Sequence, residues 1–101
     1  MNRMFARQAQ QLQQRLEKAQ EELENARVEA SAGGGAVTVL MNGNQQLKSV
    51  KISPEAVSAD DVEMLEDMVM SAVNEASRKA QELTQSRLSE ITGGIKIPGI
   101  T

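Results

Sequence analysis

The longest uninterrupted helical pattern of this chain covers residues 59–91, and it constrains the fold more than any other feature. Apolar residues recur along it every three or four positions, which keeps them on one side of an α-helix. They are Val62, Leu65, Val69, Ala72, Val73, Ala76 and Ala80. At about 1.5 Å per residue this helix reaches roughly 50 Å, more than a small sheet can cover. We therefore expect part of its surface to pack on a second chain.

Residues 2–27 predict another helix, with a narrower apolar stripe. Spacings of four and three alternate along it, as in a coiled-coil seam of Phe5, Ala9, Leu12, Leu16, Ala19, Leu23 and Ala26. Two narrow seams and a single aromatic residue bury little surface within one copy. A homodimer is the simplest closed assembly that would bury the remaining apolar helix surface. The predicted dimer interface comprises Phe5, Leu12, Leu16, Leu23, Val62, Leu65 and Val69.

Between the two helices the apolar period changes to two, which predicts strands over residues 28–32, 37–41 and 49–52. The breaks Gly33-Gly34-Gly35 and Asn42-Gly43-Asn44 supply the positive-φ residues that hairpin turns need. The expected fold is an α+β, two-layer domain: helix, three-stranded antiparallel β-meander, helix. We assign residues 1–92 to this single binding and dimerisation domain, and residues 93–101 to a flexible tail.

Composition excludes several classes of protein. The chain contains no cysteine and no histidine, so it lacks the usual acid–base and nucleophilic groups, and we expect no enzyme. The acidic group Asp60, Asp61, Glu63, Glu66 and Asp67 is better explained by the positive end of a helix dipole than by a metal site. We therefore expect no metal and no cofactor. Without a secretory signal or a membrane-length apolar run, a cytoplasmic location is expected.

Charge is unevenly distributed, although the net charge is only −3. Residues 1–16 contain three arginines and no acid, whereas residues 55–67 contain six acids and no base. Residues 75–96 return to a slight positive balance. If the two helices run antiparallel, their basic ends meet at one tip, which suits contact with a phosphate backbone.

Three segments carry a resemblance to a known family: the Gln-rich opening RQAQQLQQRLEKAQEEL, the pair VTVLMNG and VKISPE, and the run DVEMLEDMVMSAVNEASRKAQE. Together with the closing IPGI, these segments extend over nearly the whole chain, which resembles the YbaB/EbfC family of small bacterial nucleoid-associated proteins. The resemblance implies the same fold, a tweezer-shaped dimer, and binding of double-stranded DNA in the nucleoid with low or variable sequence preference. No membrane or small-molecule partner is expected.

Eight basic residues are the candidate DNA contacts: Arg3, Arg7, Arg15, Lys18, Arg78, Lys79, Arg87 and Lys96. The four on the first helix fall within an arc of about 120°, away from its seam. The glutamines of that helix could also touch base edges, although a polar helix face explains them more simply. The alternative function is a dimeric adaptor whose helical arms hold another protein, with DNA affinity incidental.

Overall fold

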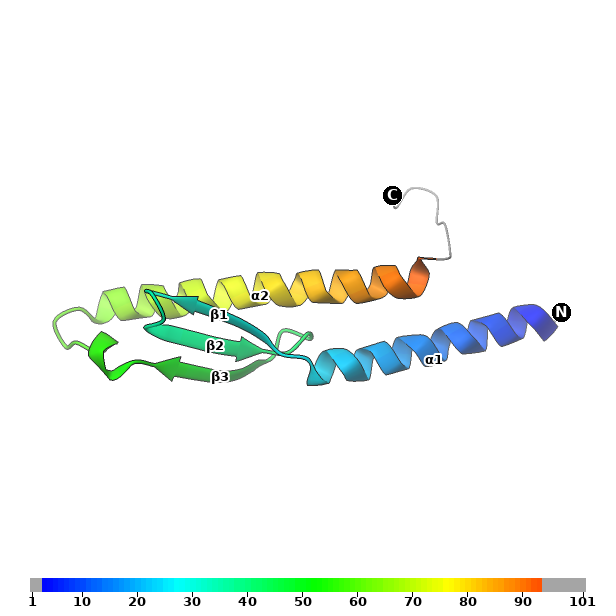
Figure 1. Cartoon of the computed structure of the whole chain (residues 1–101), viewed down its shortest axis with the longest axis horizontal. Coiled ribbons are helices and arrows are strands. Elements are labelled where there is room, and N and C mark those ends of the chain that lie inside the picture. The colour runs from blue at the N-terminus through cyan, green and yellow to red at the C-terminus, as the bar shows by residue number, and fades with distance from the viewer. Residues whose placement is uncertain (1–2, 94–101) are drawn as a thin grey trace.

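The computed structural model describes residues 3–93 and shows two long helices flanking a small sheet (Figure 1). This confirms the predicted helix, three-stranded meander, helix. The elements are α1 (Arg3–Asn25), β1 (Val28–Ala32), β2 (Val37–Met41), β3 (Leu47–Ile52), the 3-10 turn η1 (Pro54–Ala56) and α2 (Val62–Thr92). Beyond Gly93, the predicted tail lies outside the described residues.

The three strands form one antiparallel sheet in the order β1-β2-β3. Helix α2 packs across one face of the sheet, against β1 and β2. The contact is made by Ala72, Ala76 and Ala80 of the helix, all fully buried, over Val37 and Val39 of the central strand. Because alanine has a short side chain, this spacing lets the helix lie close to the sheet.

Strand β3 keeps much of its apolar surface exposed. Val39 is paired with Val50 and Val37 with Ile52, so these two β3 residues belong to the face that carries α2. They nevertheless remain 42% and 40% exposed, since α2 lies over the other two strands. One copy of the chain therefore leaves an apolar strip beside α2.

The two hairpin turns differ in how they use glycine. The first turn follows the prediction, because Gly33, Gly34 and Gly35 all have positive φ. In the second turn the prediction for Gly43 is wrong, since the residue with positive φ is Gln45, at 63°. Gly43 is required for a different reason: a Cβ there would lie 2.7 Å from Leu23 Cδ2 and 2.9 Å from the Leu23 carbonyl oxygen.

The side chain of Asn42 ties this second turn to the end of α1. It is fully buried and makes four hydrogen bonds. Its Nδ2 donates to the Glu24 carbonyl (3.2 Å) and to Gln46 Oε1 (2.8 Å), while its Oδ1 accepts from the backbone N–H groups of Asn44 (3.0 Å) and Gln46 (2.9 Å). The amide of Gly43 adds a bond to the Leu23 carbonyl at 2.8 Å. The last turn of α1 is thus fixed to the sheet.

The resulting molecule is a rod of 70 × 26 × 16 Å. Its radius of gyration is 19.3 Å, whereas a compact domain of this length has about 13 Å. Within residues 3–93, no helix is both long enough and apolar enough to cross a membrane.

Replacing Asn42 by alanine should destabilise the fold by about 3 kcal/mol, because buried backbone groups lose their partners. Urea unfolding followed by circular dichroism measures the change. The matched control is Asn44→Ala, whose exposed side chain makes no hydrogen bond within the described residues and which should stay within about 0.5 kcal/mol of the parent. Equal stability of the two variants would contradict the role assigned to Asn42.

Candidate nucleic-acid interface

Helix α1 projects from the sheet as an arm. It runs antiparallel to α2 and lies alongside the last turns of α2 over its own C-terminal half, while its N-terminal half extends past the end of α2 (Figure 1). Ala19 and Leu23 are its only buried residues. From Arg3 to Lys18 every residue is exposed except the half-buried Leu12. We call residues 3–18 the free arm.

Local sequence explains why the free arm is helical with little tertiary support. Residues 3–25 include no glycine or proline and are rich in glutamine, alanine, leucine, arginine and glutamate, which all have high helix propensity. Arg27 stabilises the opposite end of the helix, where its Nη1 donates to the carbonyls of Glu24 (3.2 Å) and Ala26 (2.8 Å). Cations at a helix C-terminus interact favourably with the dipole.

The free arm carries four cations, Arg3, Arg7, Arg15 and Lys18, against the single acid Glu17. All four cations are exposed, and none forms an ion pair with another residue between positions 3 and 93. Arg3 and Lys18 lie 15 positions apart, or roughly 22 Å along the helix axis. The arrangement is a rod of positive charge that is open to an external anion.

The basic residue Arg78 of α2, unlike the cations of the free arm, forms ion pairs within the chain. Its guanidinium donates to both carboxylate oxygens of Glu75, at 2.5 and 3.1 Å, and also pairs with Glu82. The hydrogen bonds from Arg78 lower the pKa of Glu75, and the same bonds to Glu75, followed by the charges of Glu75 and Glu82, raise the pKa of Arg78. Two carboxylates, those of Glu75 and Glu82, therefore already pair with this cation.

The other two basic residues of α2 are also engaged within the chain. Arg87 pairs with Glu22 of α1 and, at 2.7 Å, with Glu90. Lys79 donates from Nζ to the carbonyl oxygen of Glu29 in β1, at 2.7 Å. Of the eight candidate cations, Arg78 and Arg87 thus form ion pairs and Lys79 bonds a carbonyl, whereas the four on α1 make neither contact within residues 3–93. Lys96 lies outside the described residues.

Part of this difference could have been found from spacing alone. Glu75, Glu82 and Glu90 stand three or four positions from their arginines, where side chains on one helix meet. The partners of Arg87 and Lys79 on α1 and β1 could not be found in that way, because they depend on how distant segments pack.

The acidic segment before and within the first turns of α2 lies at the other end of the molecule (Figure 1). Asp61 is the N-cap residue, and its Oδ1 accepts from the backbone N–H of Met64 at 3.1 Å. Such a bond satisfies one of the unpaired N–H groups at a helix start. Among residues 3–93, no three His, Cys, Asp or Glu side chains are grouped so as to hold a metal ion.

The predicted interface residues fall into two separate groups. Phe5, Leu12 and Leu16 lie on or beside the free arm, whereas Leu23 is buried within the chain against the second turn. Val62, Leu65 and Val69 lie on the first turns of α2, and Val62 is 53% exposed. A single continuous surface does not include both groups.

Comparison with known proteins relates nearly the whole chain to one family. The model of the YbaB/EbfC DNA-binding family matches residues 1–95. A nucleoid-associated protein of Chloroflexus aurantiacus is 52% identical over 94 residues, which cover 93% of this chain and 94% of that protein. Another, from Acetivibrio thermocellus, is 54% identical over 97 residues, covering 95% and 86%.

A solved structure shares the fold. It is the crystal structure of an uncharacterized protein, HP0035, from Helicobacter pylori, with a TM-score of 0.80 and 20% sequence identity. The match covers 92% of this chain and 99% of that one.

Replacing Arg87 by glutamine should loosen the join between α1 and α2, because the contact with Glu22 is lost. We expect faster amide hydrogen exchange over residues 19–25, with a loss of global stability below about 1 kcal/mol because the pair is partly exposed. The control is Arg78→Gln, whose ion-pair partners both lie on α2. If both variants change exchange in α1 equally, the Arg87–Glu22 pair does not hold the arm.

Proposed function

Since this chain belongs to the YbaB/EbfC DNA-binding family, we propose that it grips double-stranded DNA by the phosphate backbone through the free arm of α1. The observation that carries the proposal is the contrast between the two helices: the cations of α1 have no ion-pair partner within residues 3–93, and those of α2 are engaged. A phosphate that approaches Arg3, Arg7 or Arg15 has no carboxylate of residues 3–93 to displace. Each such contact releases a condensed counterion from DNA, which drives binding.

This mode of contact has little sequence preference. Phosphate contacts set position and register but do not read bases, and Phe5 is the only aromatic residue that could stack on them. Weak preferences then follow the shape and flexibility of the duplex. Many copies bound along a chromosome contribute to nucleoid organisation and compaction and to the expression of nearby genes. The relatives' name, nucleoid-associated protein, supports the nucleoid of the bacterial cytoplasm as its location.

The triple variant Arg3→Gln/Arg7→Gln/Arg15→Gln should reduce the slope of log affinity against log salt by about 2.7, because each lost phosphate contact contributes about 0.9. Salt-titrated gel shifts on several unrelated duplexes measure this, with circular dichroism to verify the helix content.

Arg78→Gln is the matched control and should leave the slope unchanged, because that arginine is offset by Glu75 and Glu82. If the triple variant binds like the parent while Arg78→Gln does not, α2 is the contact surface. If the parent protein binds none of these duplexes, the alternative function, an adaptor whose helical arms hold another protein, is the better hypothesis.

We place the dimer interface on the apolar strip beside α2. It comprises Val50 and Ile52 of β3 with Val62, Val69 and Val73 of α2. Those α2 residues share a helix face with Ser77 and Thr84, whose side chains bond the β2–β3 turn at Gln45 (2.6 Å) and Gly43 (2.8 Å). That face is therefore turned toward β3. Pairing two such strips about a two-fold axis buries apolar surface from both copies and leaves both arms free, which gives a tweezer shape.

The variant Val50→Glu/Ile52→Glu should convert the dimer to a monomer. Dimerisation would bury two unpaired carboxylates from each copy, and their loss of hydration would outweigh the apolar contacts of the interface. Sedimentation velocity at micromolar concentration should then report a mass near 11.0 kDa. The control is Lys51→Glu, which alternates to the opposite face of the same strand and should leave the dimer intact. A parent protein that sediments as a monomer would refute this interface.

A further inference from the structure

The chain's only aromatic side chain, Phe5, is largely exposed to solvent in the single chain. Phe5 is 66% exposed, two positions from both Arg3 and Arg7, at the outer end of the free arm. An exposed aromatic residue between cations is a common anchor of protein interfaces, because it inserts into a pocket of the partner while the charges pair at the rim.

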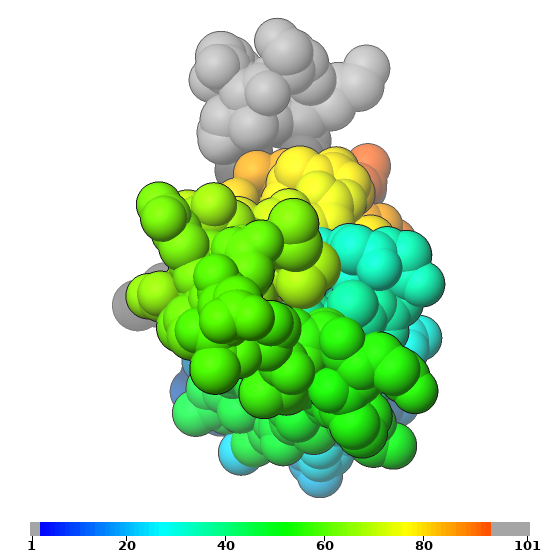
Figure 2. Space-filling model, turned by 90° about the vertical axis from the view of Figure 1, so that its left-hand side faces the viewer, coloured from blue at the N-terminus to red at the C-terminus, as the bar shows by residue number. Residues whose placement is uncertain are grey.

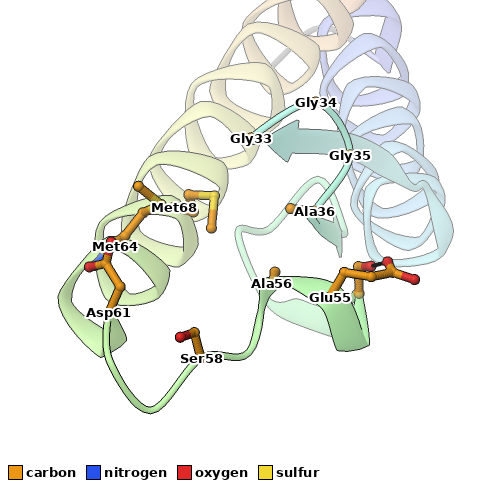
Figure 3. A pocket seen from close by; sticks show the side chains of 11 residues that line it. Gly33, Gly34, Gly35, Ala36, Glu55, Ala56, Ser58, Asp61, Met64 and Met68 are labelled. Atoms are coloured by element: carbon orange, nitrogen blue, oxygen red, sulfur yellow. Dashed lines mark hydrogen bonds between the residues drawn. The ribbon is translucent and has the colours of Figure 1, made fainter.

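A hollow of the corresponding kind lies at the opposite end of the molecule. It has a volume of about 720 Å³, and its wall is formed by the first hairpin, the segment after β3 and the start of α2 (Figure 3). Figure 2 shows the end of the molecule where these three segments meet. One turn of an α-helix occupies roughly 500 Å³, given a diameter near 11 Å and a pitch of 5.4 Å, so the hollow can admit a helix end. We call it the end cavity.

The lining of the end cavity suits both an aromatic ring and a cation. Met64 and Met68 of α2 lie on one side, where their thioethers can contact an aromatic ring favourably. Glu55 lies across from them, and Asp61 lies on the α2 side (Figure 3). Among residues 3–93, no lysine or arginine lines the cavity. The side next to Gly34 and Gly35 is open, because a Cβ added at either would meet no atom within 4 Å.

We propose that the end cavity of one molecule holds the Arg3–Arg7 end of the free arm of another molecule. Phe5 enters against Met64 and Met68, while Arg3 and Arg7 face the carboxylates of Glu55 and the acidic start of α2. The arm and the cavity lie at opposite ends of a rod 70 Å long, so they cannot meet within one copy. The end cavity also shares no residue with the apolar strip, so dimers can join through it.

This contact joins two different surfaces and therefore does not close on itself. Repeated, it links dimers into open chains. The same arginines cannot pair with carboxylates and with phosphate at once, so duplex DNA competes with the end cavity for the arm. Self-association does not depend on DNA binding, and each can be measured without the other.

Sedimentation velocity of the full chain without DNA, between about 10 μM and 1 mM at low and high salt, tests the proposal. Species larger than a dimer should form at low salt and dissociate as salt screens the charges. Met64→Ala should weaken this association at least tenfold. The matched control is Met70→Ala, because Met70 is as exposed as Met64 (59% against 57%) but does not line the cavity. Equal effects of both substitutions, or no association of the parent, would overturn the proposal.

A charge exchange tests the pairing itself. Glu55 is the better acidic partner to change, because Asp61 caps α2. Arg7→Glu alone and Glu55→Arg alone should each abolish association, and the double variant should restore it at least tenfold above either single variant. If the double variant stays dissociated, Arg7 does not meet Glu55. Met64→Ala should bind duplex DNA with the salt slope of the parent, so a failure of self-association is distinguishable from a failure of DNA binding.

Discussion

The hydrogen bonds of the buried Asn42 side chain are the constraint on which the rest of this structure depends. They join the end of α1 to the β2–β3 turn, and the absence of a side chain at Gly43 lets that turn lie against Leu23. Thr84 of α2 donates to the Gly43 carbonyl oxygen, so both long helices are held at the same turn. The direction in which α1 leaves the sheet, and hence the position of every cation on its free part, follows from this junction.

The small core explains the extended shape. Its centre consists of Val37 and Val39 under three alanines of α2, and the sheet is too short to support either helix along its full length. The helices stay helical beyond the sheet because their own sequences favour that conformation and because α1 and α2 support each other near Leu23. A protein built in this way offers long helical surfaces to partners and stabilises little of them internally.

Ion pairs and hydrogen bonds within the chain separate the two kinds of basic residue. On α2, glutamates at helical spacing and the neighbouring α1 and β1 segments engage Arg78, Lys79 and Arg87. On the free arm, the only acid is Glu17. The outer part of the arm extends beyond the end of α2, where no other element of residues 3–93 lies alongside it (Figure 1). A chain of net charge −3 can therefore present a locally positive rod to DNA, since local charge distribution decides such contacts more than the total does.

The sequence by itself determined the order and type of the elements, because the change of apolar period from 3.6 to 2 and back is a local property of the chain. It also determined the first hairpin turn, where three consecutive glycines accept positive φ. Only the tertiary structure decided which cations are free, that Gly43 serves a close contact while Gln45 takes the positive φ, and that β3 lies outside the cover of α2. These features depend on contacts between segments far apart in sequence, which periodicity and composition do not encode.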